Sequence, residues 1–123
     1  MINKFTHYQQ PDEMACGATC LRMIAKHYGK NYKTKELVQV SGTTREGTNL
    51  EGLNIAAEKI GFRTLGVKVP FNKLVEDAPL PCIAHWNQNH FVVIYKIKKN
   101  KIYVADPAHG LLVYTKEDFF KSW

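Results

Sequence analysis

The sequence contains no hydrophobic run long enough to cross a membrane. A transmembrane helix needs about 20 predominantly apolar residues, and no such stretch occurs in the 123 residues. The first residues, 1–5, also lack the apolar segment of a secretory signal peptide. We therefore expect a cytoplasmic protein.

Cysteine is scarce. The three cysteines, Cys16, Cys20 and Cys82, are an odd number, which argues against a disulfide framework and for reduced thiols. A zinc site stays open as an alternative, because Cys16 and Cys20 are spaced i, i+4 and five histidines are available. Zinc sites in chains of this size usually show a second closely spaced ligand pair. The nearest candidates, His85 and His90, lie on either side of a predicted turn, which argues against that reading.

Composition indicates one ordinary globular domain. Hydrophobic residues make up 45% and charged residues 23% of the chain, as in typical folded domains. This length suffices for one domain with a hydrophobic core but not for two domains, so we expect a single domain over residues 1–123. The net charge is +6, and no nucleic-acid-binding motif accompanies it, so a nucleic-acid partner is not expected. The densest basic cluster stands at a predicted hairpin tip, where solvation explains it: Lys96, Lys98, Lys99 and Lys101.

Helical periodicity dominates the first half of the chain. The first predicted helix runs from Met14 to Tyr28, with Asp12 as candidate N-cap and Gly29 as the stop. Thr34 can cap a second, short helix over residues 35–40. A third helix begins at a capping box and ends at Gly61. The capping box is Thr48 with Glu51, and the apolar stripe that follows is Leu53, Ala56, Ala57 and Ile60.

Strand-forming residues dominate the second half. Helices followed by antiparallel strands are the pattern of an α+β fold. We expect a last helical turn to begin at Thr115, with Asp118 three residues later. The predicted strands cover residues 62–69, 82–86, 90–98, 101–105 and 111–114, with a turn at 87–89.

The hairpin formed by residues 90–98 and 101–105 brings His90 towards Asp106. Register decides whether the two side chains share a face of the sheet. A plain two-residue loop puts them on opposite faces. A three-residue loop over residues 98–100, with Asn100 in a left-handed conformation, or an equivalent bulge, puts them on the same face. We predict the three-residue loop or the bulge.

Cys16 stands at the start of the first predicted helix. Unpaired backbone N–H groups and the helix dipole lower the pKa of a thiol at that position. A nucleophilic cysteine also needs a base, a group that orients the base, and donors for the oxyanion. His90, Asp106 and Gln10 can supply these roles. Taken singly, each has an ordinary structural explanation, such as a buried small side chain for Cys16 or an Asp-Pro turn.

Four segments of the sequence form a specific combination. They are Gln10-x5-Cys16-Gly17-Ala18-x-Cys20-Leu21, Gly42-Thr43-x3-Gly47-Thr48, His85-Trp86 before Asn89-His90-Phe91-Val92-Val93, and Val104-Ala105-Asp106-Pro107-Ala108-x-Gly110. In this combination the chain resembles, over nearly its full length, the bacteriocin-processing peptidases. These are the papain-like cysteine peptidase domains at the N-terminus of peptidase-containing ABC transporters.

The resemblance implies a papain-like fold, with a helical half against an antiparallel sheet and the site between them. It implies that Cys16 is the nucleophile, that His90 is the general base and acid, and that Asp106 orients His90. Gln10 would complete the oxyanion hole, and no cofactor is implied. The substrate would be a bacteriocin-type peptide with an amphipathic helical leader, cut after a Gly-Gly pair. The partners would be the transmembrane and nucleotide-binding domains of a transporter, at the cytoplasmic face of the bacterial plasma membrane.

Ala15 departs from the pattern of this family, whose members usually carry an acidic residue just before the nucleophile. On physical grounds, the absence of that negative charge favours the Cys16 thiolate. Relatives that have lost the cysteine bind substrates without cutting them, so a catalytically silent leader-docking module is the alternative. The remaining cysteines, Cys20 and Cys82, should pack in the core, and the remaining histidines, His7, His27 and His109, should lie on the surface.

Overall fold

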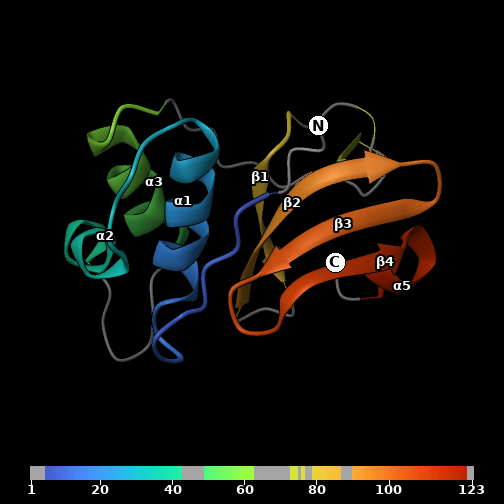
Figure 1. Cartoon of the computed structure of the whole chain (residues 1–123), viewed down its shortest axis with the longest axis horizontal. Coiled ribbons are helices and arrows are strands. Elements are labelled where there is room, and N and C mark those ends of the chain that lie inside the picture. Colours follow the sequence, from blue (N-terminus) through green and yellow to red (C-terminus); the bar gives the residue numbers. More distant parts are fainter. Residues whose placement is uncertain are drawn as a thin grey trace.

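The computed structural model describes residues 5–42, 49–62, 73–74, 76, 79–86 and 90–121. Helices come first and strands afterwards, which confirms the α+β class (Figure 1). Within the described ranges, no helix is both long and apolar enough to cross a bilayer. The elements are α1 (Cys16–His27), α2 (Thr34–Ser41), α3 (Leu50–Lys59), β1 (Cys82–Trp86), β2 (His90–Lys98), β3 (Lys101–Asp106), β4 (Gly110–Thr115) and α5 (Lys116–Phe120).

The four described strands form one antiparallel sheet in the order β1-β2-β3-β4. Figure 1 shows α1, α2 and α3 grouped on one side of the molecule and the sheet on the other. Helix α1 packs against β2, and their apolar residues, among them Met23, Phe91 and Val93, form one buried core. Because side chains alternate along a strand, the intervening residues of β2 enter a second core with Ile102 and the fully buried Phe119 of α5.

Helix α1 begins later than predicted. The Oδ1 atom of Asp12 accepts the backbone N–H of Met14 at 2.9 Å, which forms a turn in the loop rather than a helix cap. The N-cap is Ala15, so the predictions of Met14 as first residue and Asp12 as N-cap are wrong. Cys16 therefore occupies the first helical position. The predicted stop at Gly29 is confirmed, since its φ is +83° and the preceding Tyr28 is the C-cap.

Two further helix starts differ by one residue from the prediction. Thr34 is the first residue of α2 rather than its cap, because Lys33 is the N-cap. For α3, Asn49 is the N-cap and its side chain accepts the Gly52 N–H at 2.7 Å. The predicted cap, Thr48, lies outside the described residues. The predicted stripe of α3 is buried at Leu53, Ala56 and Ala57.

The last helical turn forms as expected. Thr115 is the N-cap of α5, and its hydroxyl accepts the Asp118 N–H at 3.1 Å. The strands from 82–86 onwards agree with prediction to within one residue at each end. The predicted strand over 62–69 falls, apart from Phe62, outside the described residues, and so does the turn at 87–89.

A bulge in β2 sets the register of the central hairpin. At the tip, Lys98 pairs with Lys101, so the loop has two residues and the three-residue loop is wrong. The positive φ of 54° belongs to Lys99 and not to Asn100. Between Ile94 and Lys96 the register shifts by one, so that Ile94 pairs with Val104. The extra residue, Tyr95, is the bulge that the prediction offered as the alternative, and it places His90 and Asp106 on the same face.

Candidate active site

Cys16 is held at the N-terminus of α1 with its thiol against the start of β2. The side chain is buried, with 5% exposed. Burial alone would raise the pKa of the Cys16 thiol. Hydrogen bonds with the His90 side chain and with the backbone N–H groups of Phe91 and Gly17 outweigh this, and the pKa lies below its usual value. These hydrogen bonds therefore favour the ionised form of the Cys16 thiol.

His90 connects Cys16 to Asp106. Its Nε2 lies 2.7 Å from Oδ1 of Asp106, which leaves Nδ1 as the nitrogen for the bond to Cys16. The hydrogen bond to Asp106 and then the one to Cys16 raise the pKa of His90 to about 9, against the opposing effect of burial. The lowered pKa of the Cys16 thiol and the raised pKa of His90 both favour a thiolate at Cys16 beside an imidazolium at His90.

Asp106 is the last residue of β3 and is buried, with 4% exposed. Burial would raise the pKa of its carboxyl. The hydrogen bond from His90 and the one from the Ala108 N–H, at 2.8 Å to the same Oδ1, hold the pKa below its usual value. The Ala108 N–H also fixes the side-chain rotamer, because this donor requires an acceptor oxygen at that position. The carboxylate is therefore both ionised and oriented.

Gln10 lies beside this group. Its backbone N–H donates to the Pro107 carbonyl at 2.8 Å, next to Asp106. Its Nε2 donates to the Asp12 carbonyl at 2.8 Å, and its Oε1 is buried with no hydrogen-bond partner among the described residues. An amide NH2 has two hydrogens, so one remains for a ligand. The structure thus brings together Cys16, His90 and Asp106, whereas the side-chain amide of Gln10 bonds to Asp12.

The pKa values of the other two cysteine thiols are shifted in the opposite direction. Cys20 is fully buried and its Sγ–H donates to the Phe91 carbonyl at 3.2 Å. Burial raises the pKa of Cys20 well above its usual value and raises that of Cys82 to about 11. The prediction that both pack in the core is confirmed. Of the three thiols, only that of Cys16 has a lowered pKa.

One residue near the site was missed by sequence analysis. His7 was expected on the surface, but its Nε2 lies 2.6 Å from the backbone carbonyl oxygen of Asp106 and its side chain is partly buried. No motif or periodicity around residues 5–9 signals this contact, because the two residues are 99 positions apart. His27 and His109 are exposed, as predicted.

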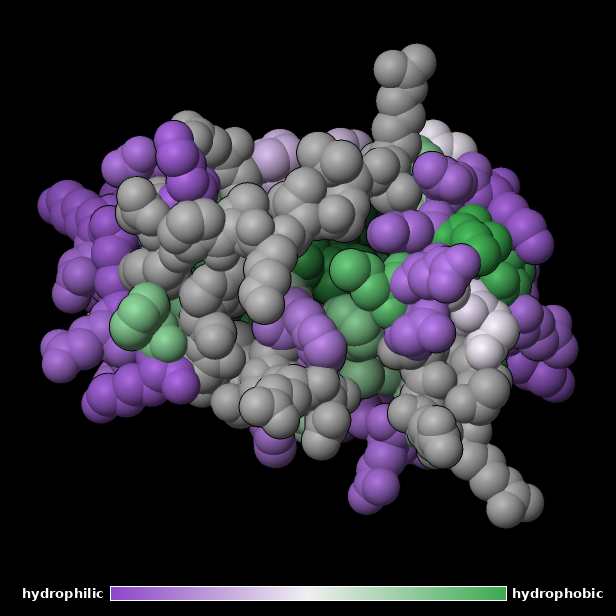
Figure 2. Space-filling model, turned by 180° about the vertical axis from the view of Figure 1, so that it is seen from behind, coloured by the Kyte–Doolittle hydropathy of each residue, from purple (hydrophilic) through white to green (hydrophobic). Residues whose placement is uncertain are grey.

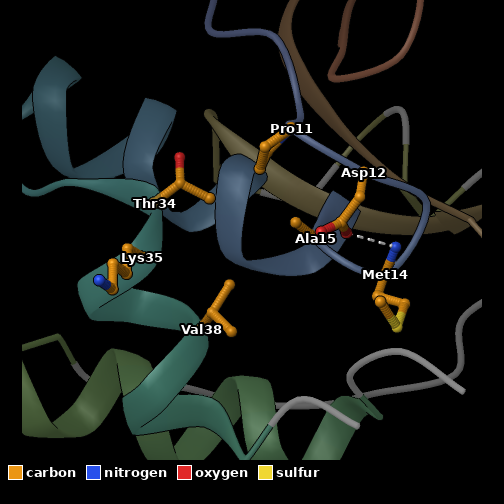
Figure 3. Close-up of a pocket in the computed structure, with 7 residues that line it drawn as sticks. All are labelled: Pro11, Asp12, Met14, Ala15, Thr34, Lys35 and Val38. Carbon is orange, nitrogen blue, oxygen red and sulfur yellow. Dashed lines mark hydrogen bonds between the residues drawn. The ribbon is translucent and has the colours of Figure 1, made fainter. Parts of the chain in front are cut away.

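A pocket of about 290 Å³ adjoins the residue before the nucleophile (Figure 3). The loop before α1 forms one side and α2 the other. Ala15 lines this pocket and is itself buried, with 1% exposed. The lining residues are Pro11, Asp12, Met14, Ala15, Thr34, Lys35 and Val38.

The zinc alternative finds no support in the side-chain arrangement. Among the residues that the structure describes, no group of three or more His, Cys, Asp or Glu side chains is placed to hold a metal ion. Cys20 uses its thiol to bond to the Phe91 carbonyl. The ring of His85 stacks on that of Phe91 at a centroid distance of 4.7 Å.

The whole arrangement belongs to a known family. The model of the Peptidase C39 family matches residues 4–123. The chain belongs to the Peptidase C39 family. This is a family of cysteine peptidases, which confirms the resemblance and the enzyme class predicted from the sequence.

Curated relatives of this C39 domain are much longer proteins. The chain is 41% identical over 121 residues to the lactococcin-G-processing and transport ATP-binding protein LagD of Lactococcus lactis, covering 94% of this chain and 17% of the relative. It is 34% identical over 109 residues to the colicin V secretion/processing ATP-binding protein CvaB of Escherichia coli, covering 89% and 16%. The chain therefore spans about a sixth of the length of these relatives.

Two solved structures resemble the C39 domain over almost its whole length. A double glycine motif protease from an AMS/PCAT transporter, in complex with the leader peptide, superposes with a TM-score of 0.94 at 32% identity, covering 98% of this chain and 86% of that one. The peptidase domain of Streptococcus ComA, a bifunctional ABC transporter involved in a quorum sensing pathway, gives 0.91 at 31% identity, covering 98% and 93%.

The pH dependence of activity should follow the Cys16–His90 pair. The rate should rise as Cys16 loses its proton and should fall when His90 loses its own, near pH 9. We expect kcat/KM for a peptide substrate to be half-lost on the alkaline side at about pH 9, rather than near the ordinary histidine pKa of about 6.5. Initial rates between pH 5 and pH 10 at constant ionic strength would test this. An alkaline limb near pH 7 would contradict the ion pair.

Proposed function

We propose that this C39 domain is a cysteine endopeptidase that cuts the leaders of bacteriocin-type or other secreted peptides after a Gly-Gly pair. The observation that carries the proposal is the unbroken chain of contacts from Cys16 through His90 to Asp106. A thiolate, a base and an orienting carboxylate are the groups that acyl transfer by a cysteine requires. The names of its relatives support the substrate class, since they describe processing and transport of bacteriocins and double-glycine proteolysis.

In the proposed mechanism, the thiolate of Cys16 attacks the carbonyl carbon of the second glycine. The imidazolium of His90 then gives its proton to the leaving amine, and the bond to the cargo breaks. The leader remains as a thioester on Cys16. Water, deprotonated by His90, attacks the thioester and releases the leader with a free carboxylate. Asp106 keeps the imidazole in position through both steps.

The oxyanion of the tetrahedral intermediate needs at least two donors. The side-chain amide of Gln10 is our candidate for one of them, through the N–H that does not bond to Asp12. The backbone N–H of Cys16 is the other, because the first N–H groups of a helix have no partner within the helix. Together with the positive end of α1, these groups would stabilise developing negative charge.

The Gly-Gly preference has a steric basis. Glycine alone lets the walls of a binding slot approach the peptide backbone closely. The leader upstream of the pair would bind as an amphipathic helix on an apolar surface. Figure 2 shows apolar residues gathered near the centre of the back of the molecule.

We also propose that residues 1–123 form one domain within a longer transporter. In that setting the partners would be transmembrane and nucleotide-binding domains, and the site would lie at the cytoplasmic face of the bacterial plasma membrane. Support comes from the relatives, which are transport ATP-binding proteins of which this chain spans about a sixth. No cofactor is needed for the proposed chemistry.

The direct test is cleavage of a synthetic leader that ends in Gly-Gly and continues into a few cargo residues. We expect a single cut after the second glycine, read by mass spectrometry. The matched control peptide carries Ala-Ala in place of Gly-Gly and should remain intact. A leader that binds but is never cut would instead favour the leader-docking module, the second candidate function.

A further inference from the structure

We propose that His7 is a positioning residue of this active site, which holds the main chain of Asp106 so that the carboxylate meets His90. The inference rests on the proposed function, because it concerns the efficiency of the same reaction. It adds His7, near the N-terminus, to the residues that support the catalytic group of Cys16, His90 and Asp106. The argument depends on the contact between His7 and the backbone of Asp106, and two neighbouring contacts show where this segment lies.

The contact of His7 is short and partly buried. Its Nε2 lies 2.6 Å from the backbone oxygen of Asp106. A carbonyl oxygen can only accept a hydrogen bond, so Nε2 of His7 must carry the proton and donate. Asp106 is thereby held from two sides, with His7 on its backbone oxygen and His90 on its carboxylate.

The neighbouring contacts show that this segment lies alongside the end of β3. Gln10 donates its backbone N–H to the Pro107 carbonyl at 2.8 Å. Gln9 donates its Nε2 to the Ala108 carbonyl at 3.0 Å, in an exposed position. Of residues 7–10, His7 bonds to Asp106 itself from a partly buried position, whereas the Gln9 side chain bonds to Ala108 from an exposed position.

His7 is not needed to hold this N-terminal segment on the protein. Phe5 stacks on Tyr95 with a centroid distance of 4.8 Å, and the guanidinium of Arg22 lies 3.7 Å from the centre of the Tyr8 ring. The turn after β3 also has its own bond, since the His109 N–H donates to the Asp106 carbonyl at 3.2 Å. Loss of the imidazole should therefore leave the fold intact and release one restraint on Asp106.

The effect should appear in the chemical step. Small displacements of a catalytic group lower rates steeply, by about 100-fold for 1 Å. We expect His7→Ala to lower kcat for the Gly-Gly leader about tenfold and to leave KM within about twofold. The alkaline limb of the pH profile should move to lower pH, because a weaker bond to Asp106 raises the pKa of His90 less. His7→Gln, which keeps an N–H donor, should recover most of kcat.

Gln9→Ala is the matched control, because it removes a similar side-chain bond to a carbonyl two residues further along. It should leave kcat, KM and the pH profile unchanged, and the thermal midpoints of all three variants should match that of the wild type. If His7→Ala behaves like Gln9→Ala, or if it lowers the thermal midpoint and kcat while the pH profile stays fixed, the positioning role is wrong. If His7→Gln is as slow as His7→Ala, donation to Asp106 is not the cause.

A second readout separates this inference from the proposed function. Alkylation of Cys16 by iodoacetamide as a function of pH reports the thiolate and needs no peptide substrate. We expect the midpoint of the Cys16 alkylation profile to lie at higher pH in His7→Ala than in the wild type and in Gln9→Ala. This shift should appear even if no leader is cut. Failure of leader cleavage with this shift present would refute only the proposed substrate. An unshifted profile would refute the role of His7.

Discussion

Replacement of Cys16 by alanine should abolish cleavage and leave leader binding nearly intact. The thiolate forms the only covalent bond between the protein and the acyl group, so its loss should lower the turnover by at least about four orders of magnitude. It contributes little to ground-state binding. We expect the Kd for the leader, measured by fluorescence anisotropy, to stay within about twofold of the wild-type value. Cleavage by the same protein should fall to the level of a blank without enzyme.

Cys82→Ala is the control for this experiment. Cys82 is half-buried, and burial raises the pKa of its thiol to about 11, so its removal should leave turnover unchanged. Measurable turnover by Cys16→Ala above the blank would exclude the cysteine mechanism. A tenfold loss of leader affinity in the same variant would show that the cysteine has a binding role that the contacts do not suggest.

His90→Ala and Asp106→Asn should differ strongly from each other. Loss of His90 removes the proposed general acid and base and one of the hydrogen bonds that lower the pKa of Cys16, so kcat/KM should fall by about 10³-fold or more. Asp106→Asn should cost only about tenfold. The amide oxygen can still accept from Nε2 of His90, because the Ala108 N–H selects oxygen rather than NH2 for that position.

The pH profile separates orientation by Asp106 from its charge. Loss of the carboxylate charge should lower the pKa of His90, so the alkaline limb of Asp106→Asn should move below about pH 9. Asp106→Ala, which removes the acceptor as well, should be slower than Asp106→Asn. If Asp106→Asn proved as inactive as Cys16→Ala, orientation of the imidazole would not be the role of this residue.

Most of the α+β order follows from local sequence signals. The candidate site residues Cys16, His90 and Asp106 follow instead from their joint placement and from the family resemblance. The start of an apolar helical stripe indicates the position of Cys16, and turn residues around Asp106-Pro107 indicate the strand end. Capping was less predictable, because Asp12 and Asn49 both carry side chains suited to an N-cap. Only the path of the chain decides that Asp12 bonds to Met14 in a turn and that Asn49 caps α3.

The register of the hairpin was only half predictable. His90 and Asp106 can share a face of the sheet only if one extra residue is present in the loop or in a strand of the hairpin. No local sequence signal indicates where that residue lies. Lys99 adopts the positive φ although asparagine follows it, so turn preference alone would have chosen the wrong residue. The contact of His7 with Asp106 was not predictable at all, because it joins segments at opposite ends of the sequence and involves a backbone atom.

The bulge at Tyr95 divides the β2–β3 hairpin into two parts with different pairing registers, one at the loop and one beside His90 and Asp106. Pairs between Lys98 and the bulge follow one register, and pairs from Ile94 inward follow another. The inner register is held separately by β1, which pairs with β2 without a shift. The exposed tip at Lys99 and Asn100 is therefore a place where an epitope or a fluorophore attachment site can be inserted without rotating His90 away from Asp106. A probe there would report on the peptidase domain while its chemistry continues.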